Sequence, residues 1–174
     1  MISPTPRTLY TLGYQKRTLE EFISILESEG ISVLIDIRET PWSHKPGFSG
    51  TTLKTALEEQ GIGYVHAKFA GNPKWLRARA RSHAECLEGY MRYLNESDGI
   101  IEAFDALVES LHSKGNKVCI TCFERHADDC HRSILSTKWR EKGARVVKHL
   151  ATEGCPRLIS RLNKLELNTL FWIP

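Results

Sequence analysis

The stretch SVLIDIR, residues 32–38, is almost continuously apolar and β-branched until Asp36 and Arg38 appear at its end. Such a run is typical of a strand that is buried on both faces of a sheet. The preceding stretch, TLEEFISILESEG (18–30), predicts a helix, because Thr18 and Glu21 have the spacing of a capping box and Gly30 can end the last turn. A helix followed by a buried strand indicates one unit of a parallel sheet.

The same alternation continues along the chain. It predicts further strands at 8–14, 62–69, 117–123 and 145–151, and further helices at 51–61, 73–95, 99–115 and 129–143. We therefore predict a three-layer α/β fold, with a mostly parallel five-stranded sheet and helices on both of its faces. Residues 1–151 are expected to form one α/β domain, and residues 152–174 a helical tail packed on it.

Composition excludes some classes of protein. The chain has 174 residues, of which 41% are hydrophobic and 26% charged, and its apolar runs are too short for a membrane span. The N-terminus does not resemble a secretory signal, and five cysteines lack the spacing of a disulfide framework. We expect a cytoplasmic protein without a membrane partner. A net charge of +3 permits nucleic acid as a partner without requiring it, and the oligomeric state is not determined.

The loop CFERHADDCHR (122–132) carries the strongest chemical signal. Parallel strands place their carboxyl ends on one edge of the sheet, where ligands bind. We predict Cys122 as a nucleophile at such a strand end, with Arg132 and loop amides holding an oxyanion. Cys130, placed at a helix start by an Asp128 or Asp129 cap, is the rival nucleophile or a resolving partner. His131 is predicted either to exchange protons with a thiol or to face solvent, which is the commoner arrangement for a lone histidine.

Two other interpretations of this loop remain open. Cys122 can be a core thiol with Arg132 facing solvent, since free cysteines are often buried. Cys119, Cys122, Cys130 and His131 can also form a zinc site. We disfavour the metal because residues three apart on one strand point to opposite faces. The same geometry disfavours a thioredoxin-like pair. We expect no metal and no cofactor.

Other strand-end loops supply predicted substrate contacts. Asp36 and Arg38 are expected to organise the edge of the site, because a buried strand has no structural use for such charges. The full predicted substrate-binding set is Asp36, Arg38, Trp42, Ser43, His44, Lys45, Tyr64, His66 and Gly71. The basic run KWLRARARSH (74–83), with Trp75 among its arginines, is either a solvated helix face, as most such runs are, or a surface that binds nucleic acid or nucleotides.

Five motifs in order resemble the uncharacterised prokaryotic family known as domain of unknown function 488. They are YTLGYQKRTLEEF (10–22), LIDIRETPWSHKPGFS (34–49), GIGYVHAKFAGNP (61–73), CFERHADDCHRSIL (122–135) and VVKHL (146–150). The resemblance covers about residues 8–151, and the element from Cys122 to Cys-His-Arg is the most distinctive signature of that family. It implies no known activity.

A weaker similarity links VLIDIRE (33–39) and the loop after Cys122 to rhodaneses and cysteine phosphatases. It implies a Rossmann-like or rhodanese-like fold, and a strand-end cysteine that takes up sulfur or phosphate while an arginine holds the anion. Here nine residues separate Cys122 from Arg132, whereas about five do so in those enzymes. We predict sulfur or phosphoryl transfer on a small anionic or nucleotide-like substrate, with a non-catalytic nucleic-acid or nucleotide binding module as the alternative.

Overall fold

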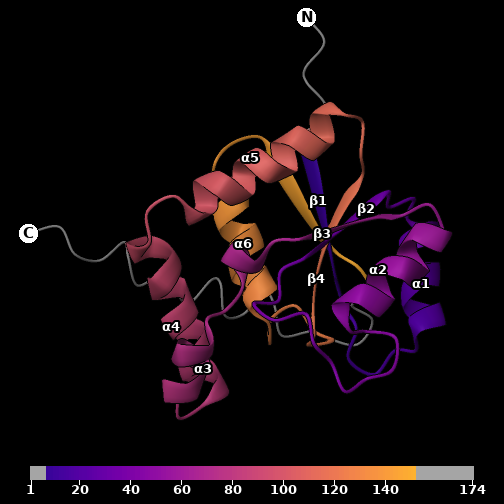
Figure 1. The fold of residues 1–174 in the computed structure, drawn as a ribbon. Helices are drawn as coiled ribbons and strands as arrows, with labels where there is room; N and C mark the ends of the chain where they lie inside the picture. Colours follow the sequence, from indigo (N-terminus) through magenta and orange to yellow (C-terminus); the bar gives the residue numbers. More distant parts are fainter. Residues whose placement is uncertain (1–6, 152–174) are drawn as a thin grey trace, which may run out of the picture.

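Five parallel strands form the centre of the molecule, and helices cover both faces of the sheet (Figure 1). The computed structural model describes residues 7–151 of the chain. The strand order is β3-β2-β4-β1-β5, and every neighbouring pair is parallel. The strands are β1 (Arg7–Gly13), β2 (Val33–Asp36), β3 (Gly63–His66), β4 (Val118–Cys122) and β5 (Arg145–His149). The three-layer α/β prediction is confirmed.

The helices connect the strands in an alternating pattern. Their bounds are α1 (Leu19–Ser28), α2 (Gly50–Glu59), the short 3-10 helix η1 (Lys68–Ala70), α3 (Lys74–Arg79), α4 (His83–Glu96), α5 (Ile100–Ser113) and α6 (His131–Arg140). Helix α1 starts where the sequence predicts, because the Thr18 hydroxyl accepts from the Glu21 amide and the Glu21 carboxylate accepts from the Thr18 amide.

Two separate cores lie on the two faces of the sheet. Helices α1 and α2 bury Phe22 and Leu53 against one face, whereas α4, α5 and α6 cover the other, where Trp139 is buried (Figure 1). Strand β4 contributes to both cores, because its side chains alternate between the faces. Cys119 belongs to the core of α1 and α2, and Cys122 to the core of α4, α5 and α6.

The structure corrects the prediction of one helix over residues 73–95. Helix α3 ends at Arg79, and α4 starts at His83 after a break in direction. Ser82 accepts from the Glu85 amide, while the Glu85 carboxylate accepts from the amide of Arg81, so the second helix has its own N-terminal cap. The predicted tail helix of residues 152–174 lies outside the described residues. In the stretch 7–151, no helix is long and apolar enough to cross a membrane.

Candidate functional site

The chain connections place a crevice between β1 and β4. From β1 the chain passes through α1 to β2, toward one edge of the sheet, and from β4 it passes through α6 to β5, toward the other edge. Adjacent parallel strands whose connections leave in opposite directions open a crevice at their carboxyl ends. Gly13 of β1 and Cys122 of β4 are register partners at that end. Cys122 therefore lies where an α/β sheet binds its ligand.

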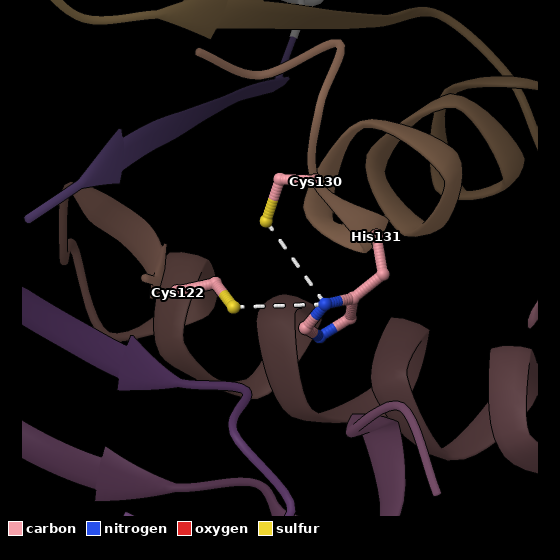
Figure 2. A group of neighbouring side chains, drawn as sticks. All are labelled: Cys122, Cys130 and His131. Atoms are coloured by element: carbon pink, nitrogen blue, oxygen red, sulfur yellow. Dashed lines mark hydrogen bonds between the residues drawn. The ribbon is translucent and has the colours of Figure 1, made fainter. Parts of the chain in front are cut away.

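Cys122 and His131 form a close pair at this position. The Sγ of Cys122 lies 3.6 Å from Nδ1 of His131, as Figure 2 shows. The other ring nitrogen, Nε2, lies 3.2 Å from the carbonyl oxygen of Ile37. A carbonyl can only accept, so Nε2 must carry the hydrogen, and in the neutral ring Nδ1 must be the bare acceptor. The backbone of Ile37 thus fixes the tautomer that turns a base toward the Cys122 sulfur.

The surroundings of His131 favour its protonated form. Burial by itself lowers the pKa of His131, but Cys130, the Ile37 carbonyl and the Glu124 carboxylate outweigh burial and raise the pKa. The Glu124 Oε2 also lies 3.6 Å from the Cys122 sulfur. An imidazole that accepts a proton from Cys122 is stabilised as a cation by this arrangement.

Cys130 lies behind this pair and is almost completely buried. Its sulfur is 4.0 Å from Nδ1 of His131 (Figure 2), and burial raises the pKa of Cys130 well above its ordinary value. Cys130 is itself the N-cap residue of α6, and its carbonyl accepts from the Ser133 amide. The expected cap at Asp128 or Asp129 is therefore wrong by one or two positions, and α6 starts later than the sequence predicts.

A hollow of about 880 Å³ opens in front of Cys122 and His131. The predicted loop after β2 forms part of its wall, with Arg38, Trp42, Ser43, His44 and Lys45. The same loop also contributes Glu39 and Thr40. The other lining residues, from the loops after β1, β3 and β4, from α3 and α4, and from the segment between these two helices, are Tyr14, Asn72, Arg77, Ala80, Arg81, Ser82, His83, Cys86, Leu87, Phe123, Glu124 and Asp129. The convergence of the strand-end loops on one edge is as expected.

A buried ion pair supports one wall of the pocket. The Arg38 guanidinium donates from Nε and Nη2 to Asp36, with distances of 2.9 Å and 2.5 Å, and from Nη1 to the Tyr14 hydroxyl and the Phe48 carbonyl. Asp36 also accepts from the Tyr64 hydroxyl at 2.8 Å. Within residues 7–151 these bonds use four of the five N–H groups of Arg38 and leave one Nη2 hydrogen at the pocket wall.

Several predicted residues support the site from outside the pocket lining. Tyr64 holds Asp36, and burial together with the Asp36 charge raises the pKa of Tyr64 and keeps it a donor. His66 contacts the Arg38 carbonyl through Nε2 at 2.8 Å. Gly71 lies against the backbone of Glu39, where a Cβ would overlap the Glu39 amide nitrogen. These three residues fix the loop after β2 rather than face the hollow.

Arg132 lies elsewhere than the sequence analysis expected. Its two terminal nitrogens donate to the backbone carbonyls of Glu124 and Arg125, and among the described residues it is not part of the pocket wall. The guanidinium therefore holds the loop that follows Cys122 from behind. A cationic residue can reach an anion in the hollow from Arg38, Lys45, Arg77 or Arg81 instead.

Four residues that the predicted site set lacks make the most informative contacts here. Tyr14 stacks on Phe48 with ring centroids 4.5 Å apart and accepts from Arg38. Asn72 and Cys86 both line the pocket, and the Asn72 amide donates to the Cys86 sulfur at 3.3 Å. Glu124 is the fourth. Tyr14 is the last residue of a predicted strand, and this position could have marked it as a site residue. Cys86 could not be found in this way, because the sequence predicts one helix over 73–95 and the separate helix α4, which carries Cys86, starts only after residues 80–82.

One comparison with known proteins decides the relationship of this chain. The family model described as "Domain of unknown function DUF488" matches residues 18–139, more than half of the chain. The chain belongs to the DUF488 family. This match includes β2, β4, Cys122, Cys130 and His131, so the pocket floor described above lies within the family region. No curated protein and no solved structure matches the DUF488 chain.

Proposed function

We propose that this DUF488 protein is a cysteine-dependent enzyme that transfers a sulfur or phosphoryl group and uses Cys122 as its nucleophile. The single observation that carries the proposal is the position of the His131 ring between the Ile37 carbonyl and the Cys122 sulfur. The Ile37 carbonyl holds the Nε2 hydrogen, so the basic Nδ1 faces the Cys122 sulfur 3.6 Å away at the floor of a large pocket. A thiol with an oriented base is the arrangement of an activated cysteine nucleophile.

The proposed reaction has two steps. The Cys122 proton moves to Nδ1 of His131, and the thiolate attacks the sulfur or phosphorus atom of the substrate. The bond from that atom to the leaving group breaks, and the imidazolium returns its proton to the leaving group. In the second step an acceptor thiol takes the sulfur atom, or water takes the phosphoryl group, and the proton that the acceptor loses restores the Cys122 thiol.

The pocket walls support an anionic or nucleotide-like substrate. Within residues 7–151 one Nη2 hydrogen of Arg38 has no protein partner, and Lys45, Arg77 and Arg81 add positive charge around the hollow. Trp42 is 61% exposed and packs edge-on against His44 with centroids 4.1 Å apart, so a flat group can stack on either ring. Glu39, Glu124 and Asp129 oppose a large polyanion, which favours a small ligand.

Mass spectrometry after incubation with thiosulfate or with p-nitrophenyl phosphate tests this proposal. We expect one of the two donors to add a sulfur atom or a phosphoryl group to the peptide that contains Cys122. The Cys122→Ser variant must lose the adduct, and Cys86→Ser, at the matched thiol of the pocket wall, must keep it. The absence of any adduct from both donors contradicts the proposed reaction types.

Nucleic-acid binding is the second candidate, and exposed tryptophans favour it. Trp75 is 53% exposed, the Arg79 guanidinium lies 5.5 Å from its ring, and Trp75 lines a second hollow together with Phe69 and Tyr93. Bases stack on such platforms while arginines contact phosphates. Anisotropy of labelled single- and double-stranded oligonucleotides at low salt measures the affinity. Absence of binding eliminates this candidate, and binding that weakens steeply with salt supports it.

We also propose that the protein works in a reducing compartment such as the cytoplasm. Cys86, Cys119, Cys122 and Cys130 are all free thiols, and the proposed chemistry needs Cys122 reduced. Alkylation of thiols during cell lysis, followed by peptide mapping, is expected to find Cys122 modified. A disulfide at Cys122 in freshly lysed cells contradicts this proposal.

A further inference from the structure

Three donor atoms converge beside the pocket floor. The two sulfurs of Cys122 and Cys130 and the Nδ1 of His131 all lie within 4.8 Å of one another (Figure 2). The sequence analysis disfavoured a metal because Cys119 and Cys122 point to opposite faces of β4. Cys119 does lie in the other core, and the structure brings together the other three residues of that candidate zinc set, Cys122, Cys130 and His131.

We propose that Cys122, Cys130 and His131 bind a single thiophilic cation of the Zn²⁺ class, with the fourth position open toward the pocket. This inference rests on the donor geometry and is independent of the proposed enzymatic function. Two thiolates and an imidazole select Zn²⁺, Co²⁺ or Cu⁺ and disfavour Mg²⁺ and Ca²⁺, which prefer oxygen ligands.

The distances fit a tetrahedral ion. With Zn–S of about 2.3 Å and Zn–N of about 2.0–2.1 Å, a sulfur and a nitrogen ligand lie about 3.5 Å apart. The observed separations from Nδ1 are 3.6 Å to the Cys122 sulfur and 4.0 Å to the Cys130 sulfur. A shift of a few tenths of an ångström brings the Cys130 sulfur to this distance from Nδ1. The two sulfurs lie within 4.8 Å of each other, and a tetrahedral ion draws them to about 3.8 Å.

The surroundings also suit a metal site. The Ile37 carbonyl accepts from Nε2 of His131, which is the outer-shell contact that orients a ligating imidazole. Cys122 and His131 line the pocket and give an entry path, while Cys130 closes the site from behind. Two thiolates around a divalent cation make a neutral unit, so the buried site carries no uncompensated charge.

Metal binding has two chemical consequences. The cation displaces both thiol protons, one each from Cys122 and Cys130, and these protons pass to solvent, so binding strengthens as pH rises. The ion also occupies the Cys122 sulfur and the Nδ1 lone pair of His131. The metal-loaded protein therefore lacks a free nucleophile, and zinc acts as an inhibitor of thiol chemistry at this site.

Titration of the reduced, metal-free protein with Co²⁺ tests the proposal. We expect one Co²⁺ per chain, a thiolate-to-cobalt charge-transfer absorption band, and loss of that band on addition of Zn²⁺. The Cys130→Ser variant is expected to bind Co²⁺ at least about 100-fold more weakly, because loss of a ligand costs more than the roughly 10–100-fold cost of an outer-shell change. Cys86→Ser, which removes a thiol outside the group, must keep the wild-type band.

A second measurement on the wild-type chain needs no variant. Equimolar Zn²⁺ is expected to block alkylation of Cys122 and leave alkylation of Cys86 unchanged. Lack of a cobalt band, or an unchanged band in Cys130→Ser, overturns the metal site. If Cys122 is alkylated rapidly and no metal binds, the metal site is overturned and the proposed enzyme stands. If metal binds but Cys122 of the metal-free protein is unreactive, the proposed enzyme is overturned and the metal site stands.

Discussion

Gly13 at the end of β1 lies directly against the backbone of Glu124, two residues after Cys122. A Cβ at position 13 would overlap the Glu124 carbonyl oxygen and lie 2.9 Å from a terminal nitrogen of Arg132. Glycine alone permits this approach between the loop after β4 and the end of β1. The identity of residue 13 therefore fixes the position of the Cys122 loop.

Gly13→Ala is expected to displace this loop and destabilise the protein by about 1–3 kcal/mol, as overpacking does in a well-filled interior. Alkylation of Cys122 should change in the same variant, because the carbonyls that Arg132 holds must move. Gly63→Ala is the control, since a Cβ there would meet Val33 at an ordinary 3.4 Å. Equal stabilities of Gly13→Ala and the wild-type chain in urea unfolding would contradict the close approach.

The buried Asp36 carboxylate provides a stability prediction. Asp36→Asn leaves the Arg38 charge buried without its partner and is expected to cost about 3–5 kcal/mol in urea unfolding. Tyr64→Phe removes one neutral donor to the same carboxylate and is expected to cost only about 1 kcal/mol. Similar losses in both variants would show that the ion pair does not hold this wall of the pocket.

Substitution of Arg132 tests whether this residue stabilises the loop after β4 or binds an anion. Arg132→Lys cannot serve both the Glu124 and the Arg125 carbonyl, so we expect a loss of about 1–3 kcal/mol in the free energy of unfolding. Arg81→Ser, at an exposed position of the pocket wall, is expected to leave stability within about 0.5 kcal/mol and to weaken binding of anions instead. A stable Arg132→Lys protein with impaired anion binding would restore the role expected from the sequence.

His149 makes stability depend on pH. Burial, followed by the charges of Arg132 and Arg140, lowers the pKa of His149 to about 4. The unfolded chain protonates this residue near pH 6.5, so between about pH 6.5 and 4 the unfolded state binds more protons and stability falls as pH falls. His149→Asn is expected to flatten that part of the profile. Parallel urea-unfolding profiles for the two proteins would rule out this contribution.

The sheet was predictable from local pattern alone. Apolar runs such as SVLIDIR can be buried only as central strands, and Thr18 with Glu21 fixes the start of α1 through contacts within four residues. The α3–α4 break was missed because both sides of it are helical in pattern, and only the Ser82 cap marks the new start. Strand positions and the start of α1 could therefore be predicted, because residues close in sequence determine them.

The sequence predicts several residues that line the pocket, but it does not predict how their side chains are oriented. The carboxyl-end rule brings Cys122, Arg38 and residues 42–45 to one pocket. The direction of Arg132 and the tautomer of His131 depend on carbonyls of Glu124 and Ile37, which lie 8 and 94 positions away in the sequence. Such contacts follow from the packing of loops and leave no periodic pattern in the chain.

The reactivity of Cys122 with and without the His131 base tests the central claim most directly. The measurement is alkylation of metal-free protein with limiting iodoacetamide near neutral pH, followed by peptide mapping. His131→Gln preserves a donor for the Ile37 carbonyl and removes the base. We predict that Cys122 is modified first among the five cysteines, and that its rate falls at least about tenfold in His131→Gln. Equally slow modification of all cysteines, or an unchanged Cys122 rate in the variant, would contradict the account.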